Sequence, residues 1–414
     1  MQEKLNRLLK WSEKYTRTDM LYLANGGFWL SVGQIISSGS ALILTIAFAN
    51  LASVETYGTY RYILAIAALF SIFSLPGMGT AITRAVAKDN NNAISLATRT
   101  RVEYSLLGTL VALVGCYYYF LNENIELSMA LLVIAVTLPV FDTFTLYTAY
   151  LLGKEKFDTH TKYQFIIQLV SISTLILALL LKSNLTLILI AYFVPLILLR
   201  IFFYFRVTKG TDASDGATEL NRQTLAFGKH LTLMSLPSAV STQIDKILMW
   251  KFFGPAQLAM YAISLAVPTQ IQGLLKRVDV LALPKLSTGN ASNADITRKW
   301  FIFTLGTLPI AALYVFLAPF IFYILFPQYS EAVFYSQILA FIIILTPKTI
   351  IRAYMEAKGN SKKLYLFHTT TSITKIALMA ILIPTFGLLG AVWAILINET
   401  ISLILIFTLM RKGT

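Results

Sequence analysis

Residues 163–182 read YQFIIQLVSISTLILALLLK, and residues 185–205 read LTLILIAYFVPLILLRIFFYF. Each run is long enough to cross the hydrocarbon core of a bilayer as an α-helix, which needs about 20 apolar residues. Only Ser183 and Asn184 separate the two runs. Continuous runs of this length are about twice as long as a strand of a membrane β-barrel, so a barrel is excluded. The stretch therefore predicts two consecutive transmembrane helices.

The rest of the chain is also rich in apolar residues and poor in charged ones. Of its 414 residues, 57% are apolar and 13% are charged, the latter being about half the fraction of a typical soluble domain. The apolar total corresponds to about twelve spans. This composition excludes an ordinary soluble enzyme, a disulfide-rich secreted domain and a disordered chain. The single cysteine, Cys116, cannot form an internal disulfide.

The spans are placed by apolar run length and by the proline, glycine and charged breaks between runs. The twelve predicted spans are 28–50, 57–83, 103–121, 127–152, 163–182, 185–205, 228–252, 259–283, 299–326, 335–357, 364–383 and 388–409. The longest connection is polar and divides the chain into two halves. We therefore predict a basic segment over 1–20, a six-helix lobe over 21–206, a cytoplasmic linker over 207–227 and a second six-helix lobe over 228–414.

The positive residues predict the orientation. The chain has 34 Lys and Arg against 20 Asp and Glu, for a net charge of +14. With the N-terminus inside, the outer loops contain only Lys182 and Lys251, which fits the excess of Lys and Arg in cytoplasmic loops. We expect both termini in the cytoplasm, and the charge needs no nucleic-acid partner. In residues 1–20, Leu and Tyr recur at helical spacing among Lys and Arg, which predicts a helix lying on the anionic inner leaflet.

An internal repeat relates the two halves. Leu51-Ala52-Ser53 followed by Tyr57 resembles Phe253-Gly254-Pro255 followed by Tyr261. Ala149-Tyr150 before Gly153 likewise resembles Ala353-Tyr354 before Gly359. Because each half has an even number of spans, both halves enter the membrane from the same side. The repeat is therefore parallel, as in transporters that rock two lobes about a site between them.

Ionisable residues at mid-membrane depth are costly and are candidates for function. Lys348 lies ten residues from the predicted inner end of its span at Lys358, about 15 Å along a helix. Arg352 is one turn below it and Glu356 one turn lower again. Two interpretations remain open for this stripe. It is either an Arg352–Glu356 pair with Lys348 reaching a neighbour, or a track of cations that binds a pyrophosphate.

Other intramembrane charges predict ion pairs. The repeat places Asp142 near Lys348 in the equivalent span, so the two could pair across an empty cavity. Lys375 and Glu399 lie at similar depth on successive helices, and we expect a structural pair between them.

Further candidates lie nearer the ends of the spans. An Arg61–Asp245 bridge, with Lys246 beside it, would close the outer mouth. Lys276 and Arg277 are candidates for the cavity or for snorkelling to the inner surface. The break at Pro76-Gly77 is either a hinge or a packing kink.

The sequence lacks the motifs of several enzyme classes. It has no Gly-x-x-x-x-Gly-Lys-Ser/Thr loop for an ATPase. His160, His230 and His368 stand alone, so no metal cluster is predicted. The predicted loops are too short for a membrane glycosyltransferase or polymerase. We expect a protein that is not an enzyme and that needs neither a cofactor nor a metal.

Four segments carry a family resemblance together. They are Tyr57-Gly58-Thr59-Tyr60, Gly77-Met78-Gly79-Thr80-Ala81-Ile82-Thr83-Arg84, Ile244-Asp245-Lys246 and Leu283-Pro284-Lys285-Leu286-Ser287. In order and spacing the chain resembles the polysaccharide biosynthesis/export family, the Wzx-type flippases of the MOP superfamily, to which MATE transporters also belong. It departs from that pattern at Leu258-Ala259-Met260-Tyr261, where the second half lacks the Tyr-Gly-x-Tyr of the first. It also lacks the two extra spans of lipid II flippases.

The resemblance implies a MATE-like all-α fold with two six-helix lobes around a central cavity, in a bacterial inner or plasma membrane. It implies a flippase that moves an oligosaccharide on undecaprenyl pyrophosphate to the outer leaflet, for a surface polysaccharide of the O-antigen or capsule type. A polysaccharide polymerase and chain-length proteins are the implied protein partners. Two alternatives remain, a cation-coupled multidrug antiporter and a membrane glycan polymerase. An antiporter that exports cations needs an acidic cavity, whereas Lys348 and Arg352 outnumber Asp142 if all three face inward.

Overall fold

The computed structural model describes residues 20–209, 219–276, 292–359 and 361–411. Nearly all of the chain in these ranges is helical, and they contain no strand. The predicted basic segment 1–20 lies almost entirely outside them, as do the centre of the linker, Arg277 and the motif Leu283–Ser287. The all-α class predicted from the apolar runs is confirmed.

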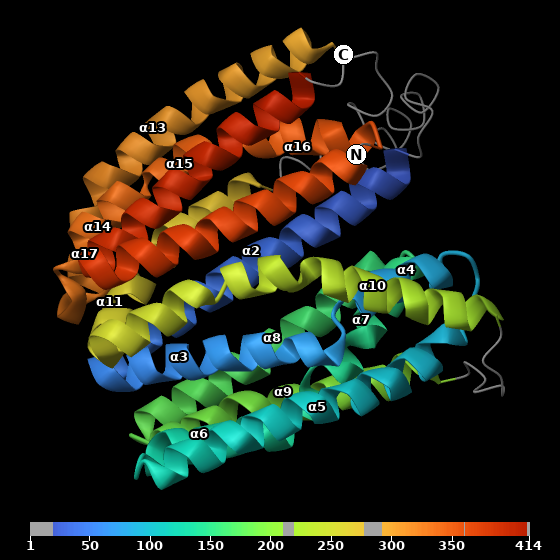
Figure 1. Ribbon diagram of the computed structural model, residues 1–414, viewed down its shortest axis with the longest axis horizontal. Helices are drawn as coiled ribbons and strands as arrows, with labels where there is room; N and C mark the ends of the chain where they lie inside the picture. The colour runs from blue at the N-terminus through green and yellow to red at the C-terminus, as the bar shows by residue number, and fades with distance from the viewer. Residues whose placement is uncertain (1–19, 210–218, 277–291, 360, 412–414) are drawn as a thin grey trace, which may run out of the picture. The chain divides into compact units, whose positions relative to one another are not determined.

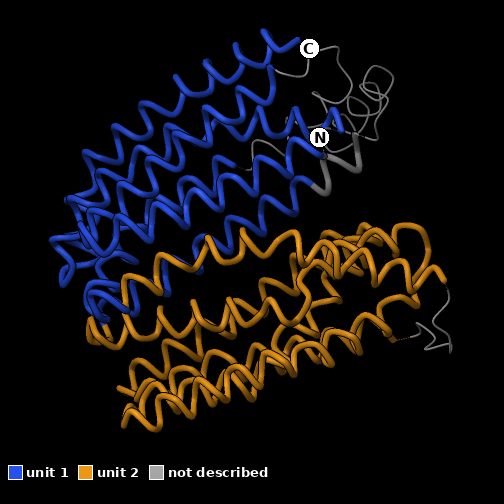
Figure 2. The backbone as a smooth tube through the Cα atoms, viewed as in Figure 1, with its two compact units in different colours: residues 1–50, 251–414 blue, residues 51–250 orange. Residues whose placement is uncertain are grey.

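Two compact units make up the chain, and Figure 2 colours them separately. Unit 2 is residues 51–250, and unit 1 is residues 1–50 with 251–414. The repeat predicted lobes over 21–206 and 228–414. The compact units differ from these lobes in two helices. The first predicted span belongs to unit 1, and the seventh belongs to unit 2. The functional division into two lobes therefore remains a prediction.

Unit 2 consists of consecutive helices that run back and forth (Figure 1). Its elements are α3 (Val54–Phe70), η1 (Ser71–Ser74), α4 (Gly77–Val86), α5 (Ala93–Leu121), α6 (Ile125–Phe141), η2 (Thr143–Thr145), α7 (Leu146–Gly153), α8 (Phe157–Leu180), α9 (Leu185–Thr208), α10 (Glu219–Ser241) and the start of α11 (Ile244–Leu275). The helix of the predicted seventh span thus begins at Glu219, nine residues earlier than the predicted 228. The connection between α9 and α10 is therefore shorter than the predicted linker 207–227.

Unit 1 contains the remaining helices. They are α2 (Met20–Leu51), most of α11, α13 (Asn293–Leu325), η3 (Pro327–Tyr329), α14 (Ala332–Leu339), α15 (Phe341–Leu345), α16 (Lys348–Ala357) and α17 (Ser361–Arg411). Asn50 at the end of α2 donates its side-chain N–H to the carbonyl of Leu325 at 2.9 Å. This bond satisfies one of the carbonyls left open at the end of α13.

Helix α17 is two antiparallel helices. The Nζ atom of Lys363 donates to the carbonyl of Leu409 at 3.1 Å, although the two are 46 residues apart. A straight helix would separate them by about 69 Å. The reversal occurs at Gly387, whose φ of 59° is in the left-handed region that favours glycine. A Cβ on Gly390 would lie 1.8 Å from the carbonyl oxygen of Leu382, so the turn also needs a glycine there.

The described residues contain nine helices long and apolar enough to cross a membrane, or ten when the bent pair Val54–Ser74 and Gly77–Val86 is taken as one span. The reversal in α17 adds a further crossing. The 57-residue stretch Glu219–Leu275 is also long enough for two, and it breaks at Gly254 (φ 77°). The chain is therefore a multi-pass membrane protein. The count of twelve spans remains a prediction.

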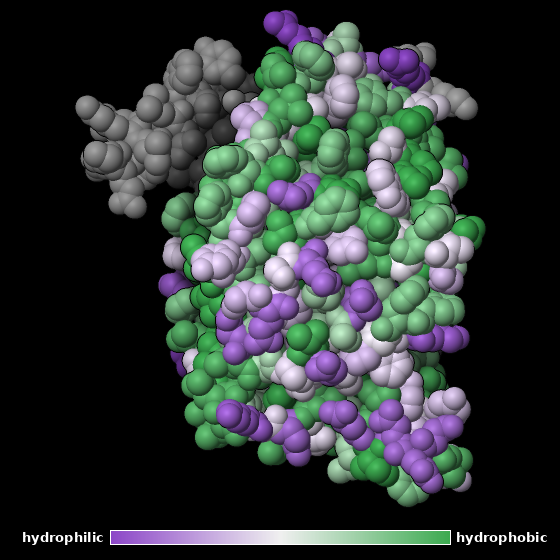
Figure 3. Space-filling model, turned by 90° about the vertical axis from the view of Figure 1, so that its left-hand side faces the viewer, coloured by the Kyte–Doolittle hydropathy of each residue, from purple (hydrophilic) through white to green (hydrophobic). Residues whose placement is uncertain are grey.

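The packing is that of a protein in lipid. Helix α5 buries Ala97, Ser105, Gly108 and Ala112, and it exposes large apolar side chains such as Leu110 (59%) and Val114 (70%). A soluble helix would bury its large apolar side chains, whereas membrane helices place small residues at their contacts. Hydrophobic side chains also cover much of the surface seen in Figure 3, with hydrophilic ones in patches among them.

Prolines inside the spans receive compensating donors from neighbouring helices. A proline lacks the N–H that would bond to the carbonyl four residues earlier. Pro195 frees the carbonyl of Ala191, and Thr174 Oγ1 of α8 donates to it at 3.0 Å. Pro139 frees the carbonyl of Ala135, to which Thr109 Oγ1 donates at 3.1 Å. Pro319 frees the carbonyl of Val315, to which Gln337 Nε2 donates at 3.0 Å. At these three sites each freed carbonyl therefore has another donor, as an apolar environment demands.

Candidate functional site: a cationic cavity in unit 2

Two broken helices define the site. The second predicted span changes from α3 into η1, passes through Leu75 with a left-handed φ of 54°, and bends by 48° into α4 at Pro76-Gly77. The fourth predicted span breaks in the same unit, where α6 ends at Phe141 and η2 follows Asp142. Helix breaks leave carbonyl oxygens without their usual N–H donors, which inside a membrane demands other partners.

A single arginine satisfies carbonyls at both breaks. Arg101 of α5 is 4% exposed. Its Nε donates to the carbonyl of Ser74 at the end of η1. Its Nη1 donates to the carbonyl of Asp142 at 2.9 Å and to Thr145 Oγ1 at 3.2 Å in η2. Arg101 therefore ties the two breaks together.

The carboxylate of Asp142 is held by a second arginine. Arg200 Nη1 of α9 lies 3.6 Å from Asp142 Oδ1. The same guanidinium donates to the carbonyl of Phe141 and lies over its ring, 4.4 Å from the centroid. One partly buried carboxylate thus lies near two cations, the buried Arg101 and the partly buried Arg200, so this cluster keeps a net positive charge.

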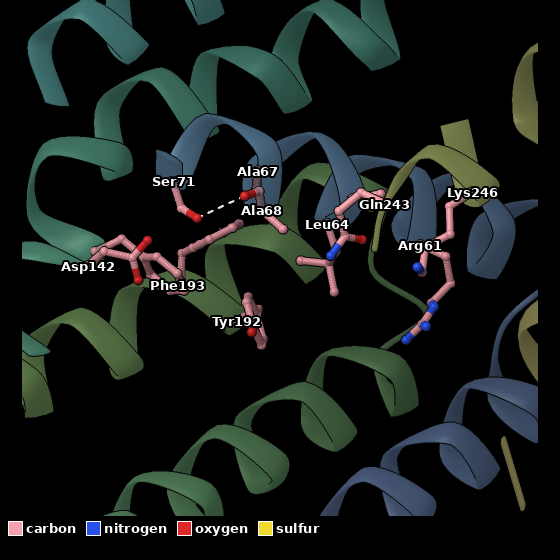
Figure 4. Close-up of a pocket in the computed structure, with 12 residues that line it drawn as sticks. Arg61, Leu64, Ala67, Ala68, Ser71, Asp142, Tyr192, Phe193, Gln243 and Lys246 are labelled. Carbon is pink, nitrogen blue, oxygen red and sulfur yellow. Dashed lines mark hydrogen bonds between the residues drawn. The ribbon is translucent and has the colours of Figure 1, made fainter. Parts of the chain in front are cut away.

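A cavity of about 360 Å³ opens beside this cluster. Its walls come from α3, from Phe141 and Asp142 at the break, from Tyr192 and Phe193 of α9, and from the α10–α11 corner. The lining residues are Arg61, Leu64, Ala65, Ala67, Ala68, Ser71, Phe141, Asp142, Tyr192, Phe193, Gln243 and Lys246. In Figure 4, Arg61 and Lys246 lie at one end of the cavity and Asp142 at the other, with Tyr192 between them.

Arg61 is the chemically distinctive residue of this cavity. The structure gives its guanidinium no ion pair within the described ranges, and its buried Nε has no hydrogen-bond partner there. Lys246, close by, pairs with its neighbour Asp245, with 3.1 Å between Nζ and Oδ1. The predicted Arg61–Asp245 bridge is therefore not formed in this structure. A guanidinium whose Nε is buried without a hydrogen-bond partner is costly and provides a site for an anion.

The other gating candidates lie at the bend of the second span. Pro76 precedes the first residue of α4, and the N–H of Gly77 donates to Thr232 Oγ1 of α10 at 3.0 Å. A Cβ on Gly77 would lie 2.5 Å from the carbonyl oxygen of Gly228, so the glycine permits close packing there. The choice between hinge and packing kink remains open.

The predicted cation stripe lies in unit 1 and is paired with acids. Lys348 Nζ makes an ion pair with Glu399 of α17 and also donates to its backbone carbonyl. Arg352 lies 3.4 Å from Glu356, one turn along the same helix. The predicted Lys375–Glu399 pair is wrong, because Lys348 occupies the carboxylate of Glu399. Asp142 and Lys348 each have a partner within their own unit.

Lys276 and Arg277 are the last two residues that the sequence offered as candidates for the cavity. Lys276 Nζ donates to Gln272 Oε1 at 3.0 Å, one turn back on its own helix. Arg277 lies outside the described residues.

In the predicted repeat, the two ion pairs join corresponding spans with opposite polarity. Asp142 lies at the break of the fourth span and pairs with Arg200 of the sixth. Lys348 follows the break between α15 and α16 in the tenth span and pairs with Glu399 of the twelfth. The acid and the base have thus changed places between the two halves. This finding extends the predicted equivalence of Asp142 and Lys348 to their partners.

Sequence reasoning did not single out Arg101, Arg200 or Phe141 as site residues. Arg200 carries the only charge inside the run 185–205, which was the available signal. Arg101 precedes the predicted third span, and only the structure reveals that its side chain reaches the helix breaks. Tyr192 of α9 also lines the cavity.

Comparison with known proteins identifies one family and several similar folds. Residues 23–277 match the family described as polysaccharide biosynthesis protein. No curated protein matches the chain in sequence. A multidrug resistance MATE family transporter of the MOP superfamily, in an outward-facing conformation, has a TM-score of 0.66 at 14% identity over 94% of both chains.

Two further solved structures are similar. The lipid II flippase MurJ in an inward closed conformation has a TM-score of 0.70 at 16% identity, over 91% of this chain and 86% of that chain. A MOP superfamily transporter from Pyrococcus furiosus Vc1, whose binding pocket is described as having reverse polarity, has a TM-score of 0.66 at 14% identity, over 94% of this chain and 95% of that chain. At these identities the likeness shows the MATE-like fold alone.

Proposed function

The chain belongs to the polysaccharide biosynthesis protein family, and on that premise we propose that it is a flippase for a lipid-linked oligosaccharide. The proposed substrate is an oligosaccharide on undecaprenyl pyrophosphate, moved from the cytoplasmic to the outer leaflet of a bacterial inner membrane. The proposed product feeds a surface polysaccharide of the O-antigen or capsule type, whose polymerase and chain-length proteins would be the partners. Both termini are proposed to lie in the cytoplasm.

The single observation that carries this proposal is the charge of the cavity in unit 2. Arg61 has no counter-ion within the described residues, and the nearby carboxylates Asp142 and Asp245 already pair with Arg200 and Lys246. Arg101 adds a further cation behind Asp142. A diphosphate diester keeps an ionised oxygen on each phosphorus, and a guanidinium binds such oxygens in a bidentate manner. The excess of positive charge therefore supports an anionic substrate.

The remaining lining residues suit a glycan. Tyr192, Gln243 and Ser71 offer polar atoms, and Phe141 and Tyr192 offer aromatic faces beside them. We infer that the diphosphate approaches Arg61 and that the first sugar lies toward Tyr192. Two conformations that expose the cavity in turn to the inner and the outer leaflet would complete the transport cycle, with no chemical step required.

The alternative of a cation-coupled drug antiporter receives less support from this geometry. An exporter of cations needs a carboxylate that is available to a proton or a cation. Asp142 lines the cavity, but it lies 3.6 Å from Arg200 and its backbone carbonyl is bound to Arg101. Arg61 and Lys246 line the same cavity, where they would repel a cationic ligand (Figure 4).

The test is transport by purified protein in liposomes that contain a fluorescent oligosaccharide linked to a lipid diphosphate. Arg61→Ala should reduce the flipping rate by about 10- to 100-fold, the value of a lost charge-assisted bond. Arg61→Lys should recover only part of the rate, because a point charge replaces a bidentate fork. The matched control is Arg99→Ala, which removes an exposed arginine paired with Glu103 on its own helix.

Two results would contradict the proposal. Flipping by Arg61→Ala at the wild-type rate would mean that the substrate does not use this cation. Wild-type protein that leaves the diphosphate lipid unmoved but expels a cationic dye along a proton or sodium gradient would identify an antiporter instead.

A further inference from the structure

Helices α4 and α10 cross in backbone contact within unit 2. A Cβ added to Gly228 would lie 2.4 Å from Met78 Sδ, and one added to Gly77 would lie 2.5 Å from the carbonyl oxygen of Gly228. Neither position accommodates a side chain without movement. The side chain of Asn90, just beyond α4, also donates to Asn221 Oδ1 of α10 at 2.9 Å. Two segments far apart in the sequence are thereby held together along several turns.

A second cavity, of about 250 Å³, lies between the same two helices. From the α4 side it is lined by Ala81, Arg84, Ala85 and Lys88, whose spacing of three and four residues places them on one face. From the α10 side it is lined by Leu220, Gln223, Thr224 and Phe227, which follow the same spacing, and Asn90 completes it. The cavity follows the glycine crossing along α4 toward the connection to α5. We call it the α4–α10 groove.

The charge of the groove is positive and is not neutralised by its walls. Arg84 lies over the ring of Phe227 at 5.2 Å, and within the described residues neither Arg84 nor Lys88 forms an ion pair. Among the described residues no carboxylate lines the groove. Of the nearest described acids in sequence, Asp89 forms an ion pair with Lys154 at 3.0 Å, and Glu219 accepts a hydrogen bond from the neutral amide of Gln223 at 3.3 Å. Two cations that share a groove with amide and hydroxyl groups suit a phosphate.

We propose that the α4–α10 groove binds the phosphate headgroup of an anionic phospholipid and thereby holds α4 against α10. The groove is smaller than the roughly 300–1,000 Å³ of sites that enclose a drug-sized ligand, so it fits a small headgroup better than an oligosaccharide. Basic pockets between transmembrane helices on the cytoplasmic side are suited to anionic lipid headgroups. The groove lies at the end of unit 2 where α4, α7 and α9 end, which is the predicted cytoplasmic end.

The bound headgroup would contact both helices at once. A ligand that binds only the associated arrangement stabilises it in proportion to its occupancy. Anionic lipid should therefore strengthen the glycine crossing. This site is separate from the cavity at Arg61, and its test uses no transport measurement, so the two proposals can fail independently.

The experiment compares full-length protein in detergent with added phosphatidylglycerol or phosphatidylcholine. Thermal unfolding and hydrogen exchange over residues 77–90 and 219–232 are the readouts. Phosphatidylglycerol, and not phosphatidylcholine, should raise the unfolding temperature and slow exchange in both segments. Arg84→Gln/Lys88→Gln should weaken the apparent lipid affinity by about tenfold or more, the value of one to two charge-assisted bonds.

The matched control is Arg99→Gln/Lys162→Gln, which removes two basic residues paired with acids one turn away on their own helices. It should respond to phosphatidylglycerol like the wild type. If Arg84→Gln/Lys88→Gln also responds like the wild type, the proposed site is wrong. Should that variant be poorly folded, Arg84→Lys/Lys88→Arg, which keeps both charges, must retain the lipid response for the proposal to stand.

A second measurement, with a soluble phosphate compound, distinguishes the two sources of phosphate. Glycerol 1-phosphate supplies the same headgroup chemistry without acyl chains. If the unfolding temperature rises only with the intact lipid, the result supports a headgroup bound from the bilayer. A full shift with glycerol 1-phosphate alone, to which phosphatidylglycerol adds nothing, would overturn the lipid assignment.

Discussion

At the scale of single residues, the intramembrane charges of this protein fall into two classes. Lys348, Arg200 and Lys246 have carboxylate partners within hydrogen-bond or ion-pair distance. Arg61 has none among the described residues and faces a cavity. Removing one member of a buried pair leaves an uncompensated charge, whereas removing an unpaired cation does not. The two classes should therefore respond differently to mutation.

Lys348 provides the clearest case for a structural role. Lys348→Met should lower the amount of folded protein in the membrane, because it leaves Glu399 uncompensated at a cost of about 3–5 kcal/mol. Lys348→Met/Glu399→Gln should restore most of the folded protein, since neither charge remains. The measurement is membrane abundance together with thermal unfolding in detergent.

The same variants decide between the two interpretations of the Lys348 stripe. If Lys348→Met alone is abundant and stable, the ion pair contributes little. If the double variant is well folded but does not move the diphosphate lipid, Lys348 contributes to substrate binding, as the sequence interpretation allowed.

At the scale of elements, the spans are interrupted helices whose breaks are satisfied by their neighbours. Arg101 bonds to carbonyls at the breaks of the second and fourth spans. Thr174 serves the carbonyl that Pro195 leaves free. The helices of unit 2 therefore depend on specific polar contacts with one another, since lipid offers no alternative partner.

This dependence predicts a coupling between Thr174 and Pro195. Thr174→Val should reduce stability by about 0.5–2 kcal/mol, the range of single hydrogen bonds between membrane helices. In a Pro195→Ala background the backbone N–H at position 195 returns and can serve the carbonyl of Ala191, so the loss should be smaller. Unfolding of the four proteins in a double-mutant cycle measures the coupling.

The control for that cycle is Thr45→Val, whose hydroxyl bonds only to the carbonyl of Ala41 on its own helix. It should show no coupling with Pro195→Ala. Additive effects of Thr174→Val and Pro195→Ala would mean that the threonine does not compensate for the proline.

At the scale of the whole molecule, the orientation in the membrane is the main open prediction. The described turns provide exposed positions at both ends of the helices. Asn124 lies between α5 and α6, and Gln328 lies in η3 between α13 and α14. Lys156 lies between α7 and α8, and Lys358 follows α16.

In a Cys116→Ser background, single cysteines at 124 and 328 should react with a membrane-impermeant maleimide added to intact cells. Cysteines at 156 and 358 should react only after the membrane is opened. The reason is that Lys and Arg gather at the second pair of turns, which favours the cytoplasm. Labelling of 156 or 358 in intact cells would reverse the proposed topology.

The sequence by itself determined the helical class, the approximate positions of the spans and the repeat. These follow from run length and from the cost of placing an open backbone or a charge in lipid, both of which are properties of the local sequence. The repeat also predicted that Asp142 and Lys348 would be equivalent, because the two are 206 residues apart in the sequence. The structure places both beside helix breaks.

Only the tertiary structure decided which charges are paired. The sequence placed Lys375 and Glu399 at the same depth, but depth leaves the rotation of each helix open. Lys348 reaches Glu399 instead, and Asp245 bonds to its neighbour Lys246, so Arg61 is left facing the cavity. Pairing depends on which helix faces meet, and that is set by the packing of small residues such as Gly77 and Gly228 against neighbouring backbones. The charge pattern alone contains no information about those contacts, because a long side chain can reach several neighbours at one depth.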